Sequence, residues 1–143
     1  MLLSDDDFRD VSAALCDTDP GQRAAMLQTL ADDPSGDPRL LALVEALLGD
    51  TTPVVVSIPL HYGELRWVAA HALAAERGAV GKCSPVILSD AVVPVNDAEL
   101  VRRGASVGVP QGGGVPGALA AFAVLRDLDL LPRRPLRLES APP

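Results

Sequence analysis

Three helix-start signals in the first fifty residues restrict the fold of this sequence more than any other feature. Ser4 stands before Asp5–Asp7, whereas Asp19–Pro20 and Asp37–Pro38 each place a capping side chain before a proline. A short polar side chain at such a position accepts a hydrogen bond from the first helical turn, and acids there face the positive end of the helix. Proline fits the first helical position because its missing N–H would have no partner there. Residues 1–50 are therefore predicted to form an acidic part with three helices.

Apolar residues at helical spacing follow each of these signals. The first helix is predicted over residues 5–17, and the third runs from Asp37–Pro38 to a stop at Gly49. The third helix is apolar on nearly every face, which is typical of a helix in the centre of a fold. We therefore predict that this helix is central and that Leu47 is buried.

The chain changes character after residue 50. Val54–Val56 and Ile58 favour extended backbone, and Pro53 and Pro59 cannot lie inside a helix. The pattern predicts an extended connector or edge strand over 51–63, then a helix over 64–77 and an extended segment over 85–95. A helix over 97–104, capped by Asn96 with Glu99, is expected next. A Gly/Pro-rich loop over 108–117, a helix over 118–129 and a final strand around Leu136–Leu138 complete the predicted order. No composition break divides the chain of 143 residues, so one domain is expected. The predicted fold class is mainly α, a compact bundle or stack of about six helices with two or three short extended segments.

One stretch matches a known repeat pattern. Leu65–Arg66–Trp67–Val68–Ala69–Ala70 has the Leu-Arg opening followed by an alanine pair, and Leu47–Gly49, Asp50 and Pro53 partly match a preceding helix end and loop. Over roughly residues 37–80 the chain thus resembles HEAT-type helical repeats. The resemblance implies a HEAT-like helical stack whose surface binds a partner. The connector departs from the family's pattern because it is longer and richer in β-branched residues.

Charge and composition exclude several classes of function. The net charge is −7, and residues 1–50 hold three Arg against eleven acids. An acidic chain without a basic stripe is a poor nucleic-acid binder. The N-terminus lacks the basic and apolar regions of a signal peptide, and Pro110 and Pro116 interrupt the longest uncharged run. We expect a cytoplasmic protein without membrane contact, and the single Lys among eleven Arg indicates a GC-rich bacterial source.

The two cysteines predict neither a metal site nor a cofactor. Cys16 and Cys83 lie 67 residues apart in the sequence, and no CxxC or Cys/His spacing accompanies them. A zinc centre needs about four such ligands. The expectation is reduced thiols, no metal and no cofactor.

The rare residues of the chain gather in one short segment. Both histidines, the only Trp and the only Tyr fall within residues 61–71, as His61, Tyr62, Trp67 and His71. Pockets collect aromatic and convergent polar side chains, so this segment is the candidate site.

Helical geometry divides this segment among faces. At 100° per residue, a core face holds Leu65 and Leu73, a second face holds Glu64, Trp67 and His71, and Arg66 lies on a third. His61 and Tyr62 are expected in the loop before the helix, whose free N–H groups offer a place for an anion.

Three hypotheses follow for residues 61–77. In the first, the chain is a binding or adaptor protein whose partner, another protein, contacts Trp67, Arg66, His61 and Tyr62. In the second, it is a small cofactor-independent enzyme or small-molecule-binding protein, an isomerase, cyclase or hydrolase with His61, His71, Glu64 and Tyr62 as acid–base groups around Trp67. In the third, Trp67 and His71 only pack. A closed concave pocket that holds both histidines favours the second hypothesis, and a flat or convex surface around Trp67 favours the first.

A glycine motif provides one more candidate. Gly112, Gly114 and Gly117 match G-x-G-x-x-G, but no βαβ unit surrounds them as a dinucleotide site requires. The Gly112–Gly117 loop is therefore interpreted as a hinge before the last helix, with a mobile lid over residues 61–71 as the alternative.

Overall fold

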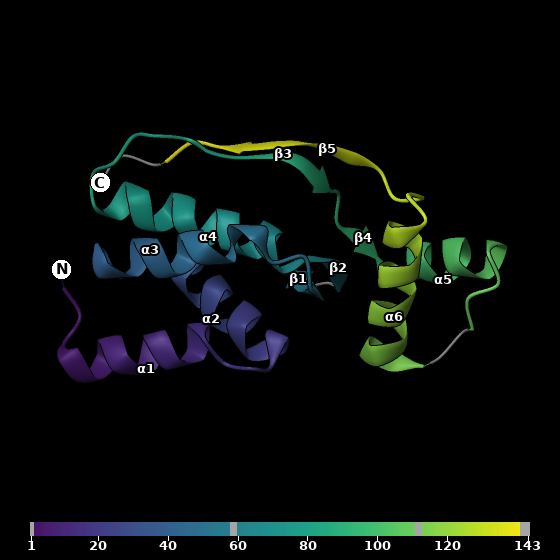
Figure 1. Cartoon of the computed structure of the whole chain (residues 1–143), viewed down its shortest axis with the longest axis horizontal. Helices are drawn as coiled ribbons and strands as arrows, with labels where there is room; N and C mark the ends of the chain where they lie inside the picture. The colour runs from purple at the N-terminus through teal and green to yellow at the C-terminus, as the bar shows by residue number, and fades with distance from the viewer. Residues whose placement is uncertain (1, 58–59, 111–112, 141–143) are drawn as a thin grey trace.

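The structure is a computed structural model that describes residues 2–57, 60–110 and 113–140. Within these ranges the chain is mainly α with short strands, which confirms the coarse prediction (Figure 1). The helices are α1 (Asp5–Leu15), α2 (Pro20–Asp32), α3 (Arg39–Glu45), the 3-10 helix η1 (Ala46–Gly49), α4 (Leu65–Ala79), α5 (Asp97–Ser106) and α6 (Gly114–Asp127). The strands are β1 (Pro53–Ser57), β2 (His61–Glu64), β3 (Val86–Val92), β4 (Val95–Asn96) and β5 (Arg133–Leu138).

The three N-terminal helices begin where their signals predict. The Ser4 hydroxyl accepts a hydrogen bond from the Asp7 N–H at 3.1 Å, and the Asp19 carboxylate accepts one from the Gly21 N–H at 2.9 Å. The Asp37 carboxylate accepts one from the Arg39 N–H at 3.0 Å. Each side chain satisfies an N–H group of a first turn that has no partner inside its helix.

The central helix is α4, which corrects the prediction for the third helix. In α3 the side chains of Leu40, Leu41 and Val44 are buried, but Ala42 is exposed. The chain then tightens into η1, where Leu47 is only half-buried. Apolar residues on every face would allow α3 to pack in the centre of the fold. They do not place it there, because a central helix also needs neighbouring elements on all sides.

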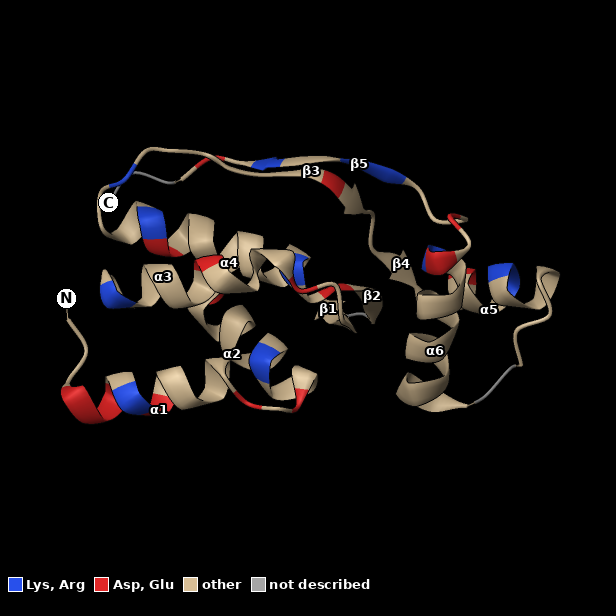
Figure 2. Cartoon of the chain, viewed as in Figure 1, with Lys and Arg blue, Asp and Glu red and all other residues tan. Residues whose placement is uncertain are grey.

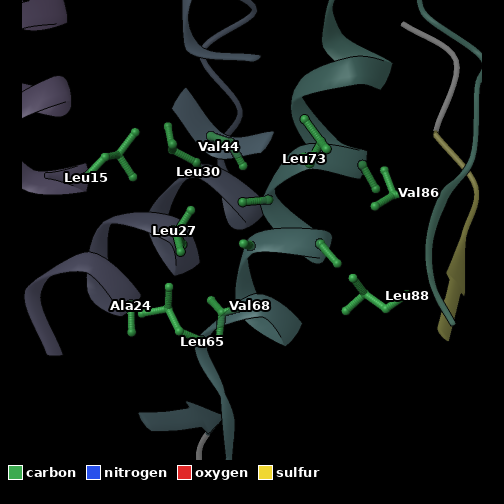
Figure 3. Close-up of a cluster of buried hydrophobic side chains, with 14 of the residues drawn as sticks. Leu15, Ala24, Leu27, Leu30, Val44, Leu65, Val68, Leu73, Val86 and Leu88 are labelled. Carbon is green, nitrogen blue, oxygen red and sulfur yellow. The ribbon is translucent and has the colours of Figure 1, made fainter. Parts of the chain in front are cut away.

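Helix α4 has those neighbours. Leu65 and Leu73 on its predicted core face are fully buried, as are Ala69 and Ala72. The first core, which these residues share with α1, α2, α3, β1 and β3, has Leu27 of α2 on one side of α4 and Leu88 of β3 on the other (Figure 3). Burial on both sides accounts for the alanine-rich sequence of α4, since small side chains allow close approach.

The predicted connector is a β-hairpin rather than a single extended segment. Strands β1 and β2 pair antiparallel, with Val54 opposite Gly63, and β4 pairs with the other edge of β2. Gly63 fits here because an added Cβ would lie 3.1 Å from Cγ1 of Val56. Ile58 and Pro59, on which the prediction also relied, lie outside the described residues.

The predicted extended segment over 85–95 contributes to two separate sheets. Strand β3 pairs antiparallel with β5, which confirms the final strand, and β4 joins β2. The β3–β5 ribbon runs from the α1–α4 side of the molecule to the α5–α6 side (Figure 1). A second core lies on the latter side and includes Tyr62, Leu100, Phe122 and Leu125.

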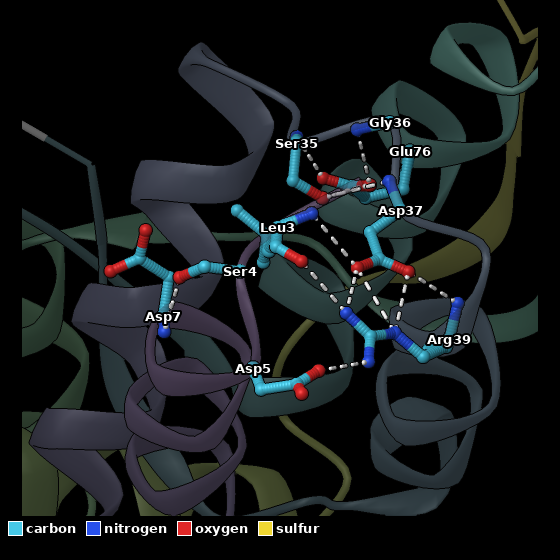
Figure 4. A network of polar contacts seen from close by, with 9 residues as sticks. All are labelled: Leu3, Ser4, Asp5, Asp7, Ser35, Gly36, Asp37, Arg39 and Glu76. Atoms are coloured by element: carbon cyan, nitrogen blue, oxygen red, sulfur yellow. Dashed lines mark hydrogen bonds and ion pairs between the residues drawn. The ribbon is translucent and has the colours of Figure 1, made fainter. Parts of the chain in front are cut away.

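A buried polar network joins the N-terminus to α3 and α4 (Figure 4). The Asp37 carboxylate accepts hydrogen bonds from the Leu3 N–H at 3.1 Å and from the Arg39 side chain at 2.8 Å. Hydrogen bonding to Arg39 is the main reason that the pKa of Asp37 falls to about 2. Glu76 of α4, also fully buried, accepts from the Ser35 N–H at 2.6 Å and the Gly36 N–H at 3.2 Å. These contacts hold the α2–α3 turn against α4.

Candidate functional site

A hollow of about 710 Å³ lies where α2, the β1–β2 hairpin and α4 meet. Both histidines of the sequence and its only Trp line this hollow. Its lining residues are Gln28, Ala31, Asp32, Val56, Ser57, His61, Trp67, Val68, His71 and Pro94. The hollow is concave and holds both histidines, but it is open to solvent at the exposed His71, so it meets only part of the criterion for the second hypothesis.

One wall is an aromatic pair on consecutive turns of α4. The ring centroids of Trp67 and His71 are 5.8 Å apart, with the ring planes at 46°. Trp67 is half-buried and packs against the first core, which fixes the position of its indole. Partial burial lowers the pKa of His71, because it disfavours the charged imidazolium. At neutral pH this wall therefore presents an uncharged imidazole beside an indole.

His61 enters the hollow from strand β2. It is half-buried and lies opposite Ser57 of β1 and Asn96 of β4. Strand pairing on both edges holds the backbone at this position, so His61 is placed by the sheet and not by a loop. The structure thus brings His61 together with Trp67 and His71, as predicted.

Tyr62 is separated from the hollow, contrary to the expectation that it would join His61. Successive side chains of a strand point to opposite faces, and residues 61–64 are a strand. Tyr62 is fully buried in the second core, where its hydroxyl makes no hydrogen bond of normal geometry with any described residue. Burial, with the nearby Asp97 carboxylate, raises the pKa of this hydroxyl. Tyr62 is therefore a core residue.

Glu64 and Arg66 also lie away from the hollow, and they form an ion pair. Glu64 is the last residue of β2, with extended backbone, so the helical arithmetic that placed it beside Trp67 does not apply. One Glu64 carboxylate oxygen, Oε1, lies 2.9 Å from Nη2 of Arg66, and the other, Oε2, lies 3.6 Å from Nη1 of Arg126 of α6. Arg66 also donates to the Asp90 carbonyl, and Arg126 donates to the Thr51 carbonyl. This buried group connects the side of the molecule that holds α6 to the start of α4.

The first N–H groups of α4 are already bonded. The Leu65 N–H donates to the Thr52 carbonyl at 2.9 Å, and the Arg66 N–H donates to the Asp50 carbonyl at 2.8 Å. The anion position that was expected at this helix start is therefore taken by the chain's own backbone.

The glycine loop borders a different hollow. Helix α6 begins at Gly114, four residues earlier than predicted, while Gln111 and Gly112 lie outside the described residues. Gly113, Gly114 and Gly117 line a second hollow of about 290 Å³ together with residues of α5, and no described residue of 61–71 lines it. The described part of the loop thus gives no support to a lid over the candidate site.

Sequence reasoning missed the wall that α2 contributes, formed by Gln28, Ala31 and Asp32. One local signal was present. Asp32 stands in the last turn of a helix that has no basic residue in that turn, whereas acids usually stand at helix starts.

Other site chemistry finds no support in the described part of the chain. In residues 2–57, 60–110 and 113–140, no group of three or more His, Cys, Asp or Glu is placed to hold a metal ion. Cys16 and Cys83 are free thiols, both exposed. No helix of the described residues has the length and apolar character to cross a membrane. Comparisons with protein-family models, with curated proteins and with solved structures found no match.

Proposed function

We propose that the protein binds a small organic molecule in the hollow lined by His61, Trp67 and His71. The observation that carries this proposal is that these rare side chains, from β2 and two turns of α4, border one hollow of about 710 Å³. Hollows of roughly 300–1,000 Å³ with aromatic walls and a few polar groups are typical of small-molecule sites. The proposal keeps the binding part of the second hypothesis.

Binding fits this geometry better than acid–base catalysis. The enzyme hypothesis needs the Tyr62 phenol and the Glu64 carboxylate beside the histidines, but Tyr62 lies in the second core and Glu64 pairs with Arg66. The histidine that remains on α4, His71, lies beside Trp67 with the two rings tilted at 46°. An indole and a neutral imidazole side by side suit contact with a flat ligand.

A fluorescence screen tests the proposal directly, because Trp67 is the only Trp in the chain. A collection of small aromatic molecules is titrated against the wild type, and saturable changes in Trp67 emission are recorded. We expect His71→Ala to weaken the binding of each hit while the urea midpoint of unfolding stays nearly unchanged, since His71 is exposed. Gln22→Ala, an exposed change on α2 outside the hollow, is the matched control. Hits whose affinity is the same in His71→Ala would contradict the proposed site.

The surface around 61–77 also supports a second candidate, the adaptor of the first hypothesis. The hollow opens to solvent, and α3 packs against α4 as the two helices of a HEAT-like pair would. In this case a partner protein inserts a side chain beside Trp67. Capture of a defined partner that is lost in Trp67→Ala but kept in Gln22→Ala, together with a screen without hits, would favour the adaptor.

A further inference from the structure

The charges that line the hollow are of one sign. Among the described lining residues, Asp32 is the only Asp or Glu, and neither Lys nor Arg is present. His71 does not supply a positive charge, since partial burial lowers its pKa. Asp32 makes no ion pair with any described residue, so its carboxylate is available to a ligand.

The end of α2 adds to this negative character. Gln28, Ala31 and Asp32 belong to the last two turns of the helix, so its carboxyl end borders the hollow. That end carries roughly half a negative charge, which a basic residue often offsets. The last turn of α2 contains no basic residue, and Asp33 follows it. The blue part of α2 in Figure 2 lies near the beginning of the helix, away from this end. The carboxylate and the helix end thus both attract positive charge.

The opposite wall suits a cation as well. The indole of Trp67 has a negative face, and a cation near such a face is attracted by the ring quadrupole. An anion would find no basic side chain among the described lining residues. The first two N–H groups of α4, which would otherwise attract an anion, are bonded to the carbonyls of Thr52 and Asp50.

We propose that the ligand is a small organic cation, an ammonium or guanidinium group carried on a flat apolar body. This inference rests on the proposed function and names the ligand class for the same hollow. The cationic group lies toward Asp32 and the end of α2, and the flat body contacts Trp67 and His71. Val56, Val68 and Pro94 supply the apolar remainder of the wall.

Three probes that share a phenyl ring and differ in charge test the ligand class. 2-Phenylethylamine is a cation at neutral pH, 2-phenylethanol is neutral and 3-phenylpropionate is an anion. Each is titrated into the whole chain, and Trp67 emission reports binding. We expect the amine to bind at least about fivefold more tightly than the alcohol, and the anion to bind most weakly.

Two neighbouring variants locate the charge effect. Asp32→Asn should weaken amine binding about two- to fivefold, the range for an exposed charge pair, and should leave alcohol binding unchanged. Asp33→Asn removes the same charge one residue away, outside the lining, and should change amine binding much less. Both residues are exposed, so the urea midpoint should confirm that each variant folds.

The outcomes separate the two proposals. If the alcohol or the anion binds as tightly as the amine, or if Asp32→Asn and Asp33→Asn weaken the amine equally, the cation proposal is wrong while small-molecule binding stands. If none of the three probes gives a saturable change in Trp67 emission at millimolar concentration, the cation proposal is overturned. In that case, a hit of another chemical class in the fluorescence screen would still support the proposed function.

Discussion

Replacement of Asp37 by Asn should destabilise the protein in a way that depends on pH. The Asp37 carboxylate is fully buried and accepts hydrogen bonds from the N–H groups of Leu3 and Arg39 and from the Arg39 guanidinium. Asn has nearly the same volume but carries no charge, and its NH₂ group cannot accept from a donor. The change therefore removes the ionic part of the network and leaves the packing almost intact.

The magnitude follows from the pKa of the carboxyl. The folded-state pKa is about 2, against 3.8 for the ordinary group. One pKa unit corresponds to 1.36 kcal/mol, so ionisation of Asp37 stabilises the fold by about 2 kcal/mol. Because the folded pKa is the lower one, this stability is fully present above pH ~4 and is lost as the pH falls toward ~2. Asp37→Asn lacks it at every pH.

Urea unfolding at several pH values provides the assay. At pH 7 the variant should be less stable by about 2–4 kcal/mol, the upper part arising from donors left without an acceptor. For a chain of this size a loss of 2 kcal/mol lowers the melting temperature by about 4–8 °C. The gap between wild type and variant should shrink as the pH falls from ~4 to ~2. Asp6→Asn is the control, since that side chain is 87% exposed and its ion pair with Arg9 should contribute less than about 1 kcal/mol. A gap below about 0.5 kcal/mol at pH 7, or one that does not change with pH, would refute the reasoning.

Three further changes test other parts of the fold. In urea unfolding, Leu47→Ala should lower the free energy of unfolding by about 1–2 kcal/mol, because Leu47 is half-buried, and Leu73→Ala should lower it by about 2–5 kcal/mol, because Leu73 is fully buried. Equal losses would contradict the central position of α4. Glu64→Gln should cost about 3–5 kcal/mol, since it leaves Arg66, which is 16% exposed, without an ion-pair partner among the described residues and leaves Arg126 with only the exposed Asp127. Glu139→Gln at an exposed pair should change stability by less than about 1 kcal/mol. Tyr62→Phe should change the unfolding free energy by less than about 1 kcal/mol, because the buried hydroxyl makes no hydrogen bond of normal geometry with a described residue. A larger loss would mean that the nearby Asp97 carboxylate is a strong partner.

Local signals in the sequence determined where most helices begin. Ser4, Asp19 and Asn96 each accept a hydrogen bond from a first-turn N–H, and such a contact involves only residues two or three positions apart. The core face of α4 was also predictable from local sequence, because the regular helical repeat places Leu65 and Leu73 on the same side of the helix. The resemblance to HEAT-type repeats stays a prediction.

The candidate site was predictable only in part. The sequence indicated the segment 61–71, and the structure places His61, Trp67 and His71 of that segment at one hollow. It also separates Tyr62 and Glu64 from that hollow, because residues 61–64 form a strand whose conformation depends on pairing with β1 and β4. Strand pairing joins residues distant in sequence, so the local pattern could not distinguish this strand from a loop.

The long-range partners were decided by the tertiary structure alone. Arg126 reaches Glu64 across 62 positions of the chain, and Asp32 reaches the hollow from another helix. No periodicity connects such residues, because their proximity results from how helices pack after each has formed. The sequence by itself therefore determined the helices and the segment that holds the rare side chains. Packing decided which of those side chains share a hollow and which charges face it, since only packing sets the distances between separate elements.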